Sequence, residues 1–172
     1  MGKVKTNSGH PAIILHPNAR EMKIIVDTNL DSPLIEYDEQ NDTTYFSRAF
    51  LDELPKHART MQVVRVLILL RDIQYETAGR RNAQYDLVKD LVLALNKFEY
   101  IHELHVQLEL GGDFNFSQAK ILAYFYASSF KEWTASFTGK DNNGIWQNLN
   151  VGSALDRRLG GWFRVLRARG EL

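Results

Sequence analysis

Apolar residues recur along this chain with two periods, and each period predicts a different secondary structure. Residues 102–110 alternate strictly, with leucine or valine at every even position from 104 onwards. This is the pattern of a half-buried strand, because neighbouring side chains of a strand point to opposite faces. Residues 82–97 instead place apolar side chains three and four positions apart, which predicts a helix with one apolar stripe.

The same reasoning extends over most of the chain. Strands are expected at residues 12–16, 22–28, 62–71, 102–110 and 132–138, and helices at residues 45–54, 82–97, 116–129 and from Ser153 onwards. The stretch 62–72 is nearly all apolar, which is typical of a strand covered on both faces. The stretch 31–44 is polar without a sustained period and is predicted to be a loop. Ser117 is the expected N-cap of the third helix, and a break or kink in the last helix is expected at Gly160-Gly161.

The order of these elements predicts the fold class. Strands alternate with helices in the middle of the chain, which favours an α/β domain with a small, mainly parallel sheet and helices on one side. One helix per unit between the strands gives an arrangement like an irregular leucine-rich-repeat curve. Residues 12–28 predict an N-terminal β-hairpin. We expect a flexible N-terminus at 1–11, a single domain at 12–169 and a tail at 170–172.

Several phrases between Phe46 and Arg169 resemble the C-terminal region of fungal F-box-like proteins of unassigned function. They include "VVRVLILL", "LVLALNKFEYIHELHVQLEL" and "GSALDRRLGGWFRVLR". In those proteins an apolar strand precedes a helix that ends in an "LNKF"-type phrase, and an "L-x-V-x-L" strand follows. The resemblance implies a strand–helix fold. The sequence has no "LP-x-E-I" type F-box segment, so the docking onto a ubiquitin-ligase adaptor that such a segment provides is not implied.

Composition narrows the class of protein further. A chain of 172 residues with 44% apolar and 24% charged residues has the balance of one globular domain. Lys+Arg and Asp+Glu number 21 each, so the overall charge selects neither an acidic nor a basic partner. The absence of cysteine excludes disulfides and thiolate chemistry. The longest apolar run, residues 66–70, is too short to cross a bilayer. We therefore expect a soluble intracellular protein of the cytoplasm or nucleus, with no membrane span.

The glycine pair Gly111-Gly112 lies between an expected strand and an expected helix, where phosphate-binding loops are found. The pair lacks the lysine and hydroxyl residue of a Walker loop and the third glycine of a dinucleotide fingerprint. We therefore interpret it as a turn in which glycine permits positive φ. The neighbouring Phe114 and Phe116 are expected to lie under the next helix.

No catalytic or metal-binding signature stands out. His102 and His105 in "HELH" are three positions apart rather than the four of a zinc helix, and a strand sends them to opposite faces. We expect no catalytic residue, no metal and no cofactor. An alternative is a small-molecule enzyme whose site lies at the C-terminal ends of the parallel strands. The residues nearest to that position are Asp72, Gly111, Gly112 and Asp113.

The favoured function is non-catalytic binding of a protein partner, whose identity the sequence does not give. The polar side of the alternating strands provides the candidate surface, which consists of Glu103, His105, Gln107, Glu109, Glu132, Thr134 and Ser136. Trp146 stands in a polar loop and is the candidate aromatic anchor, because aromatic anchors dominate the energetics of interfaces.

A third hypothesis is phosphate or RNA binding by the arginines of the last helix, Arg157, Arg158, Arg164 and Arg167. A phosphate-binding helix needs its cations on one stripe. Only Arg157 and Arg164 share one, so nucleic acid is not the expected partner. The acidic stretch 27–53 could offset these charges within the chain, or the two regions could be separate solvated faces.

Overall fold

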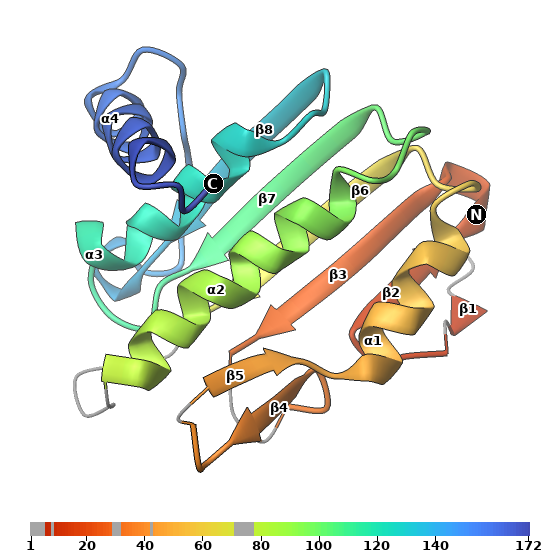
Figure 1. Cartoon of the computed structure of the whole chain (residues 1–172). Helices are drawn as coiled ribbons and strands as arrows, with labels where there is room; N and C mark the ends of the chain where they lie inside the picture. Colours follow the sequence, from red (N-terminus) through yellow and green to blue (C-terminus); the bar gives the residue numbers. More distant parts are fainter. Residues whose placement is uncertain (1–5, 8, 29–31, 42, 71–77) are drawn as a thin grey trace.

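The computed structural model describes residues 6–7, 9–28, 32–41, 43–70 and 78–172 and shows a mixed α/β fold (Figure 1). The strands are β1 Thr6–Asn7, β2 Ile13–His16, β3 Glu21–Asp27, β4 Ile35–Asp38, β5 Thr43–Phe46, β6 Val63–Leu69, β7 Glu103–Glu109, β8 Glu132–Thr138 and β9 Gln147–Asn148. The α-helices are α1 Arg48–Glu53, α2 Ala78–Leu95, α3 Phe116–Ala119 and α4 Ala154–Ala168. The 3-10 helices are η1 Pro17–Ala19, η2 Leu54–His57, η3 Lys120–Ala127 and η4 Lys140–Asn142.

Seven strands form one sheet in the order β1-β2-β3-β6-β7-β8-β9. Its centre is parallel, because β3, β6, β7 and β8 run in the same direction and pair over their full lengths. The edges are antiparallel: β2 pairs with β3 and with β1, and β9 pairs with β8. The expectation of an α/β fold with a mainly parallel sheet is confirmed.

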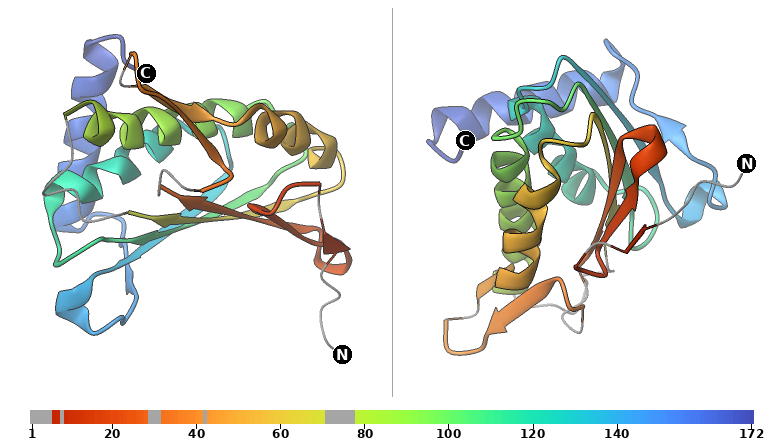
Figure 2. Two further views of the ribbon diagram at one scale, coloured as in Figure 1. Left: turned by 90° about the horizontal axis from the view of Figure 1, so that it is seen from below. Right: turned by 90° about the vertical axis from the view of Figure 1, so that its right-hand side faces the viewer.

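The helices cover one face of this sheet (Figure 2). The four parallel strands follow chain order across the sheet, so crossovers of a single hand bring every connecting helix to the same side. Side chains on that side are buried in every parallel strand, among them Ile24, Val66, Leu104 and Ala135. The core is therefore a single layer between the sheet and the helices.

Two sequence-based expectations about strands are wrong. The strand at 62–72 is not covered on both faces, since Arg65 in β6 is exposed and its apolar neighbours on that side are only half-buried. The predicted loop at 31–44 contains β4 and the first two residues of β5, which pair antiparallel, and the other two residues of β5 fall in the predicted helix at 45–54. Asp38 closes the turn that follows β4, because its carboxylate accepts hydrogen bonds from Gln40 N and from the Asn41 side chain. Strands of four residues are too short for the alternation of side chains to be visible in the sequence.

The segment after β7 differs from the expected α-helix at 116–129. Only α3 is α-helical, and η3 continues it as a 3-10 helix. Five consecutive residues of η3, from Ile121 to Phe125, are buried, because the sheet covers η3 on one side and α4 packs against it on another. Ser117 is not the N-cap: the Asn115 side chain accepts a hydrogen bond from Ser117 N at 2.8 Å.

The last helix, α4, is continuous through Gly160-Gly161, so the expected break is wrong. A Cβ added at Gly160 would lie 3.9 Å from the Tyr126 ring of η3, an ordinary van der Waals distance, so Gly160 faces η3. The buried side chains Leu159 and Leu166 on the same helix supply the packing that offsets the low helix propensity of glycine.

The start of α4 is joined to η3 by a cap and an aromatic contact. Ser153 accepts a hydrogen bond from Asp156 N, and the Asp156 carboxylate accepts from Gly152 N. Tyr126 donates its hydroxyl proton to the same carboxylate and lies against the rings of Trp133 and Phe163. Burial and the bond to Asp156 raise the pKa of Tyr126.

A buried carboxylate attaches the N-terminal segment to the first helix. Glu53 accepts hydrogen bonds from Gly9 N at 2.9 Å, from Lys56 Nζ at 2.8 Å and from the His57 ring at 2.8 Å. These three donors lower the pKa of Glu53 from 4.5 to about 2, with Lys56 the largest cause. The adjacent His10 is buried with its ring edge against Phe50.

We predict that Asn115→Ala lowers the free energy of unfolding by about 1 kcal/mol, because an N-cap is lost. Ser117→Ala is the matched control and changes that free energy by less than about 0.5 kcal/mol, since its hydroxyl is exposed and is not the cap. Urea denaturation followed by circular dichroism measures both variants. A larger loss in Ser117→Ala than in Asn115→Ala would contradict the assignment of the cap.

We predict that Glu53→Gln destabilises the protein by about 1 to 3 kcal/mol near pH 7, because charged hydrogen bonds are lost at a buried site. A carboxyl whose folded-state pKa is depressed stabilises above its unfolded value near 4.5, and this contribution disappears as the pH falls towards 2. The difference in unfolding free energy between wild type and variant therefore shrinks below pH 4.5. Chemical denaturation at a series of pH values measures it, and a difference independent of pH would refute the proposed origin.

Candidate functional site

The face of the sheet opposite the helices carries the side chains that alternate with the core. We call it the open face and define it as Glu21, Lys23, Ile25, Asp27, Val63, Arg65, Leu67, Leu69, Glu103, His105, Gln107, Glu109, Glu132, Thr134 and Ser136. No α-helix of the described residues lies on this side (Figure 2). The four residues of β7 that the sequence nominated, Glu103, His105, Gln107 and Glu109, all belong to it.

Polar contacts fix the side chains across the middle of the open face. Arg65 Nε lies 3.0 Å from a carboxylate oxygen of Glu21. The His105 ring contacts the Thr134 hydroxyl at 2.7 Å and the Glu103 carboxylate at 3.1 Å. A carboxylate only accepts, so a neutral His105 ring with its proton on Nε2 donates to Glu103 and accepts from Thr134. These contacts hold the side chains in the middle of the open face in place.

A groove of about 380 Å³ runs along one side of the open face. Its floor is formed by β6, β7 and β8, and the chain around β9 forms its wall. The polar groups that line it are those of Arg65, His105, Gln107, Thr134, Ser136, Asn148 and Asn150. This wall could not be predicted from the sequence. Strand β9 has only two residues, too few to show an alternating pattern, and it is defined by its pairing with β8.

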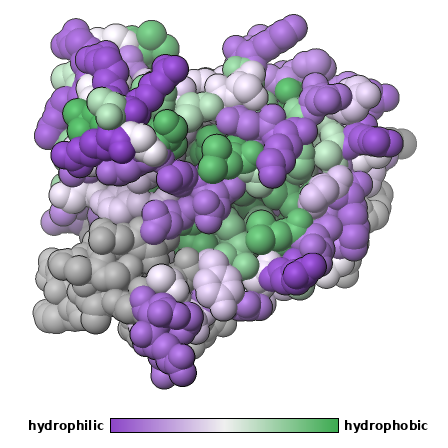
Figure 3. Space-filling model, in the orientation of Figure 1, coloured by the Kyte–Doolittle hydropathy of each residue, from purple (hydrophilic) through white to green (hydrophobic). Residues whose placement is uncertain are grey.

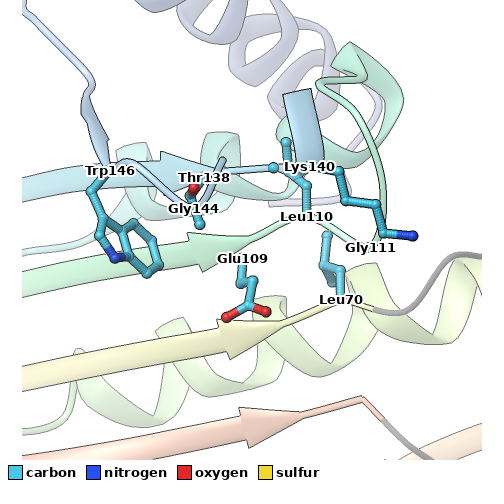
Figure 4. Close-up of a pocket in the computed structure, with 9 residues that line it drawn as sticks. Leu70, Glu109, Leu110, Gly111, Thr138, Lys140, Gly144 and Trp146 are labelled. Carbon is cyan, nitrogen blue, oxygen red and sulfur yellow. The ribbon is translucent and has the colours of Figure 1, made fainter. Parts of the chain in front are cut away.

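A second pocket, of about 480 Å³, lies at the C-terminal ends of β6, β7 and β8 (Figure 4). Trp146 borders it at one end and Lys140 at the other, with Glu109 and Leu70 between them. Trp146 is 39% exposed, and its neighbour Ile145 is 67% exposed. Both therefore present apolar surface beside the open face.

The loops around this second pocket are tied together by backbone contacts. Lys140 N donates to Gly112 O at 2.9 Å, and Phe114 N donates to the Asp141 carboxylate. A Cβ at Gly139 would lie 2.8 Å from Gly112 O, so this approach requires glycine at position 139. The expected positive φ at Gly111-Gly112 is wrong: the glycines with positive φ among the described residues are Gly144, Gly152 and Gly170.

The aromatic residues beside the glycine pair also differ from expectation. Phe114 does not lie under the next helix: it is 39% exposed, and its ring contacts that of Phe137 in β8. Phe116 begins α3 and is partly buried against the core. The two rings thus stabilise the loop and the start of the helix, while the edge of the second pocket remains open.

The described residues that line the second pocket include no pair of facing carboxylates. Glu109 is the one carboxylate among its described lining residues, and the Thr138 hydroxyl donates to Ile145 O at 3.0 Å. General acid–base chemistry of the glycosidase type needs two facing carboxyl groups. Of the residues nominated for an enzyme, Gly111 lines the pocket, Asp113 is exposed and Asp72 lies outside the described residues.

The described residues contain neither a cluster of metal-ligand side chains nor a membrane-spanning helix. Within these residues, no three histidine, aspartate or glutamate side chains come close enough to hold a metal ion. No helix that the structure describes is both long and apolar enough to span a bilayer.

The nominated arginines of α4, Arg157, Arg158, Arg164 and Arg167, are all exposed. The structure does not gather them into one site. Arg157 donates to Gly152 O at 3.2 Å, whereas Arg158 lies over the Phe116 ring. The described parts of the acidic stretch, in β4, β5 and α1, lie at the opposite end of the molecule from α4 (Figure 1). The two charged regions are therefore separate faces.

Comparisons with protein-family models, with curated proteins and with solved structures find no match for this chain. Its function must therefore be inferred from the open face, the two hollows beside it and the charged helix.

We predict that Thr138→Val loosens the wall of the groove, because the bond from Thr138 to Ile145 O is lost. Amide hydrogens of residues 142–149 should exchange about five- to tenfold faster, which corresponds to a loss of about 1 kcal/mol in local stability. Hydrogen exchange read by mass spectrometry measures this change. Ser136→Ala, on the same strand and facing the groove, is the control; equal protection in both variants would contradict the role of Thr138.

Proposed function

We propose that this protein is a non-catalytic protein-interaction domain whose open face binds a basic segment of a partner protein. The observation that carries the proposal is the one-sided covering of the sheet by α-helices (Figure 2), which leaves the groove beside the open face exposed. Parallel sheets are usually covered on both faces. An uncovered one is a surface on which a partner can take the place of the missing layer.

The chemistry of the surface supports a partner with apolar side chains. Ile25, Leu67 and Leu69 lie on the open face and are only half-buried. Ile145 and Trp146 project beside the groove with substantial exposure. Exposed apolar groups rimmed by polar ones are typical of protein interaction sites, and tryptophan is enriched among the residues that dominate binding energy.

The charge of the open face supports a basic partner. The face holds five carboxylates, Glu21, Asp27, Glu103, Glu109 and Glu132, and two cations, Lys23 and Arg65. Arg65 already pairs with Glu21. The exposed carboxylates Glu109 and Glu132 are thus available to lysine or arginine side chains of the partner, and complementary charge speeds association and selects among partners.

We also propose two finer features of the fold, a leucine-rich-repeat-like curve and an N-terminal hairpin. The parallel strands follow chain order, with their connections on one side, which supports an irregular leucine-rich-repeat-like curve. The antiparallel pairing of β2 with β3 supports an N-terminal hairpin. A relationship to F-box-like proteins rests on the sequence phrases alone. We propose an intracellular location because the chain has no cysteine.

We predict that the double variant Glu109→Lys/Glu132→Lys loses the partner. The tagged full-length protein is incubated with nuclease-treated extract of its own cells, and bound proteins are quantified by mass spectrometry. Reversing two exposed charges on the open face should lower recovery of a specific partner at least tenfold, because attraction becomes repulsion. Glu36→Lys/Glu39→Lys is the matched control, with two exposed reversals on the β4–β5 hairpin.

The expected result is a partner retained by wild type and control, lost by the open-face variant, and released by raised salt. A purified fragment of that partner that contains its basic segment should compete for binding. Recovery that is equal in all three proteins would place the interaction elsewhere and refute the proposed surface. Capture of a protein that is insensitive to these charges does not support the proposal.

A further inference from the structure

On the helix-covered side of the molecule, three cations gather around two aromatic rings where α4 meets α3 and η3. Arg158 Cζ lies 3.8 Å from the centre of the Phe116 ring, and Lys120 Nζ lies 5.9 Å from it. Lys120 Nζ is also 4.1 Å from the Trp162 ring, and Arg169 Cζ is 5.6 Å from it. We call Phe116, Lys120, Arg158, Trp162 and Arg169 the cation–aromatic strip.

The strip follows one flank of α4. Arg158, Trp162 and Arg169 are separated by four and seven residues, so they lie along the same side of the helix. Eleven residues of α-helix extend over about 16 Å. Phe116 of α3 and Lys120 of η3 lie against this flank of α4. The strip is therefore elongated, and Figure 3 shows hydrophilic and hydrophobic residues side by side over α4.

The positive charges of the strip have no acidic partners in the described part of the chain. None of Lys120, Arg158 and Arg169 forms an ion pair there. The nearest carboxylate on α4, that of Asp156, accepts hydrogen bonds from Tyr126 and Gly152. Three like charges around two rings repel one another, and an anion between them would relieve that repulsion.

Cation–π packing by itself does not account for this arrangement. One cation over each ring would supply the usual gain of about 0.5 to 1 kcal/mol at an exposed site. Here each ring has two cations, and Lys120 is shared between both. The second cation on each ring adds repulsion to the free protein. An anionic ligand bound at the strip would offset this repulsion.

We propose that the cation–aromatic strip binds single-stranded RNA. Lys120, Arg158 and Arg169 would hold successive phosphates, and the partly exposed rings of Phe116 and Trp162 would stack on bases. Proteins that bind single strands without sequence preference combine these two kinds of group. The strip lies on the side of the sheet away from the open face, so this proposal does not rest on the proposed function.

Binding is tested with the full-length protein and a fluorescein-labelled 12-nucleotide oligouridine, by fluorescence anisotropy. We expect the affinity to fall as salt rises, with a slope of log K against log salt of about −2, because each phosphate contact on a single strand contributes about −0.7. Lys120→Ala/Arg158→Ala should weaken binding at least tenfold and reduce the slope to about −0.7. Arg59→Ala/Lys131→Ala, which removes two exposed cations elsewhere, should bind like wild type.

The role of the rings is tested separately with Trp162→Leu, which keeps an apolar side chain against the core. This variant should weaken oligouridine binding about fivefold or more, since stacking of one base contributes about 1 to 3 kcal/mol. Its affinity for inorganic polyphosphate, which has no bases, should not change. Circular dichroism verifies that each variant is folded.

Two results would overturn the proposal. If Lys120→Ala/Arg158→Ala binds oligouridine as tightly as wild type, the strip is not the site. If Trp162→Leu binds oligouridine like wild type, and polyphosphate displaces the RNA at equal phosphate concentration, the strip recognises charge alone and RNA is not its specific ligand.

Discussion

The structure depends on one constraint, which is that every crossover between the parallel strands returns on the same side of the sheet. Because β3, β6, β7 and β8 follow chain order, α1, α2 and η3 are brought to one face and enclose the core there. The opposite face then has no layer of its own. Its side chains are held by contacts within the sheet, such as those of Arg65 with Glu21 and of His105 with Glu103 and Thr134.

The same constraint divides the molecule into two chemically different sides. The open face is acidic, with apolar residues at its centre and at its wall. The groove beside β9 makes part of this face concave. The last helix, α4, lies on the helix-covered side, and many of its exposed residues are arginines. A chain with zero net charge thus presents two surfaces of opposite sign. The two proposals differ accordingly: a basic protein segment for the open face and an anionic strand for the cation–aromatic strip.

Periodicity in the sequence was sufficient for the larger elements. The strands at 102–110 and 132–138 and the helix at 82–97 were predicted close to their observed bounds, because each buries one face and therefore shows a regular pattern. The pair β4 and β5, the 3-10 form of η3 and the continuity of α4 were not. They depend on strand pairing, on burial from two sides and on the packing of Leu159 and Leu166, which are contacts between distant segments.

What the sequence by itself determined is the fold class and the polar side of β7, since alternation assigns Glu103, His105, Gln107 and Glu109 to one face whatever that face contacts. Only the tertiary structure decided that this face is uncovered, that β9 forms a wall beside it and that Lys120 joins Arg158 around Phe116. The physical reason is that local sequence fixes the direction of a side chain relative to its own strand or helix. The neighbours it meets are set by how the strands and helices pack.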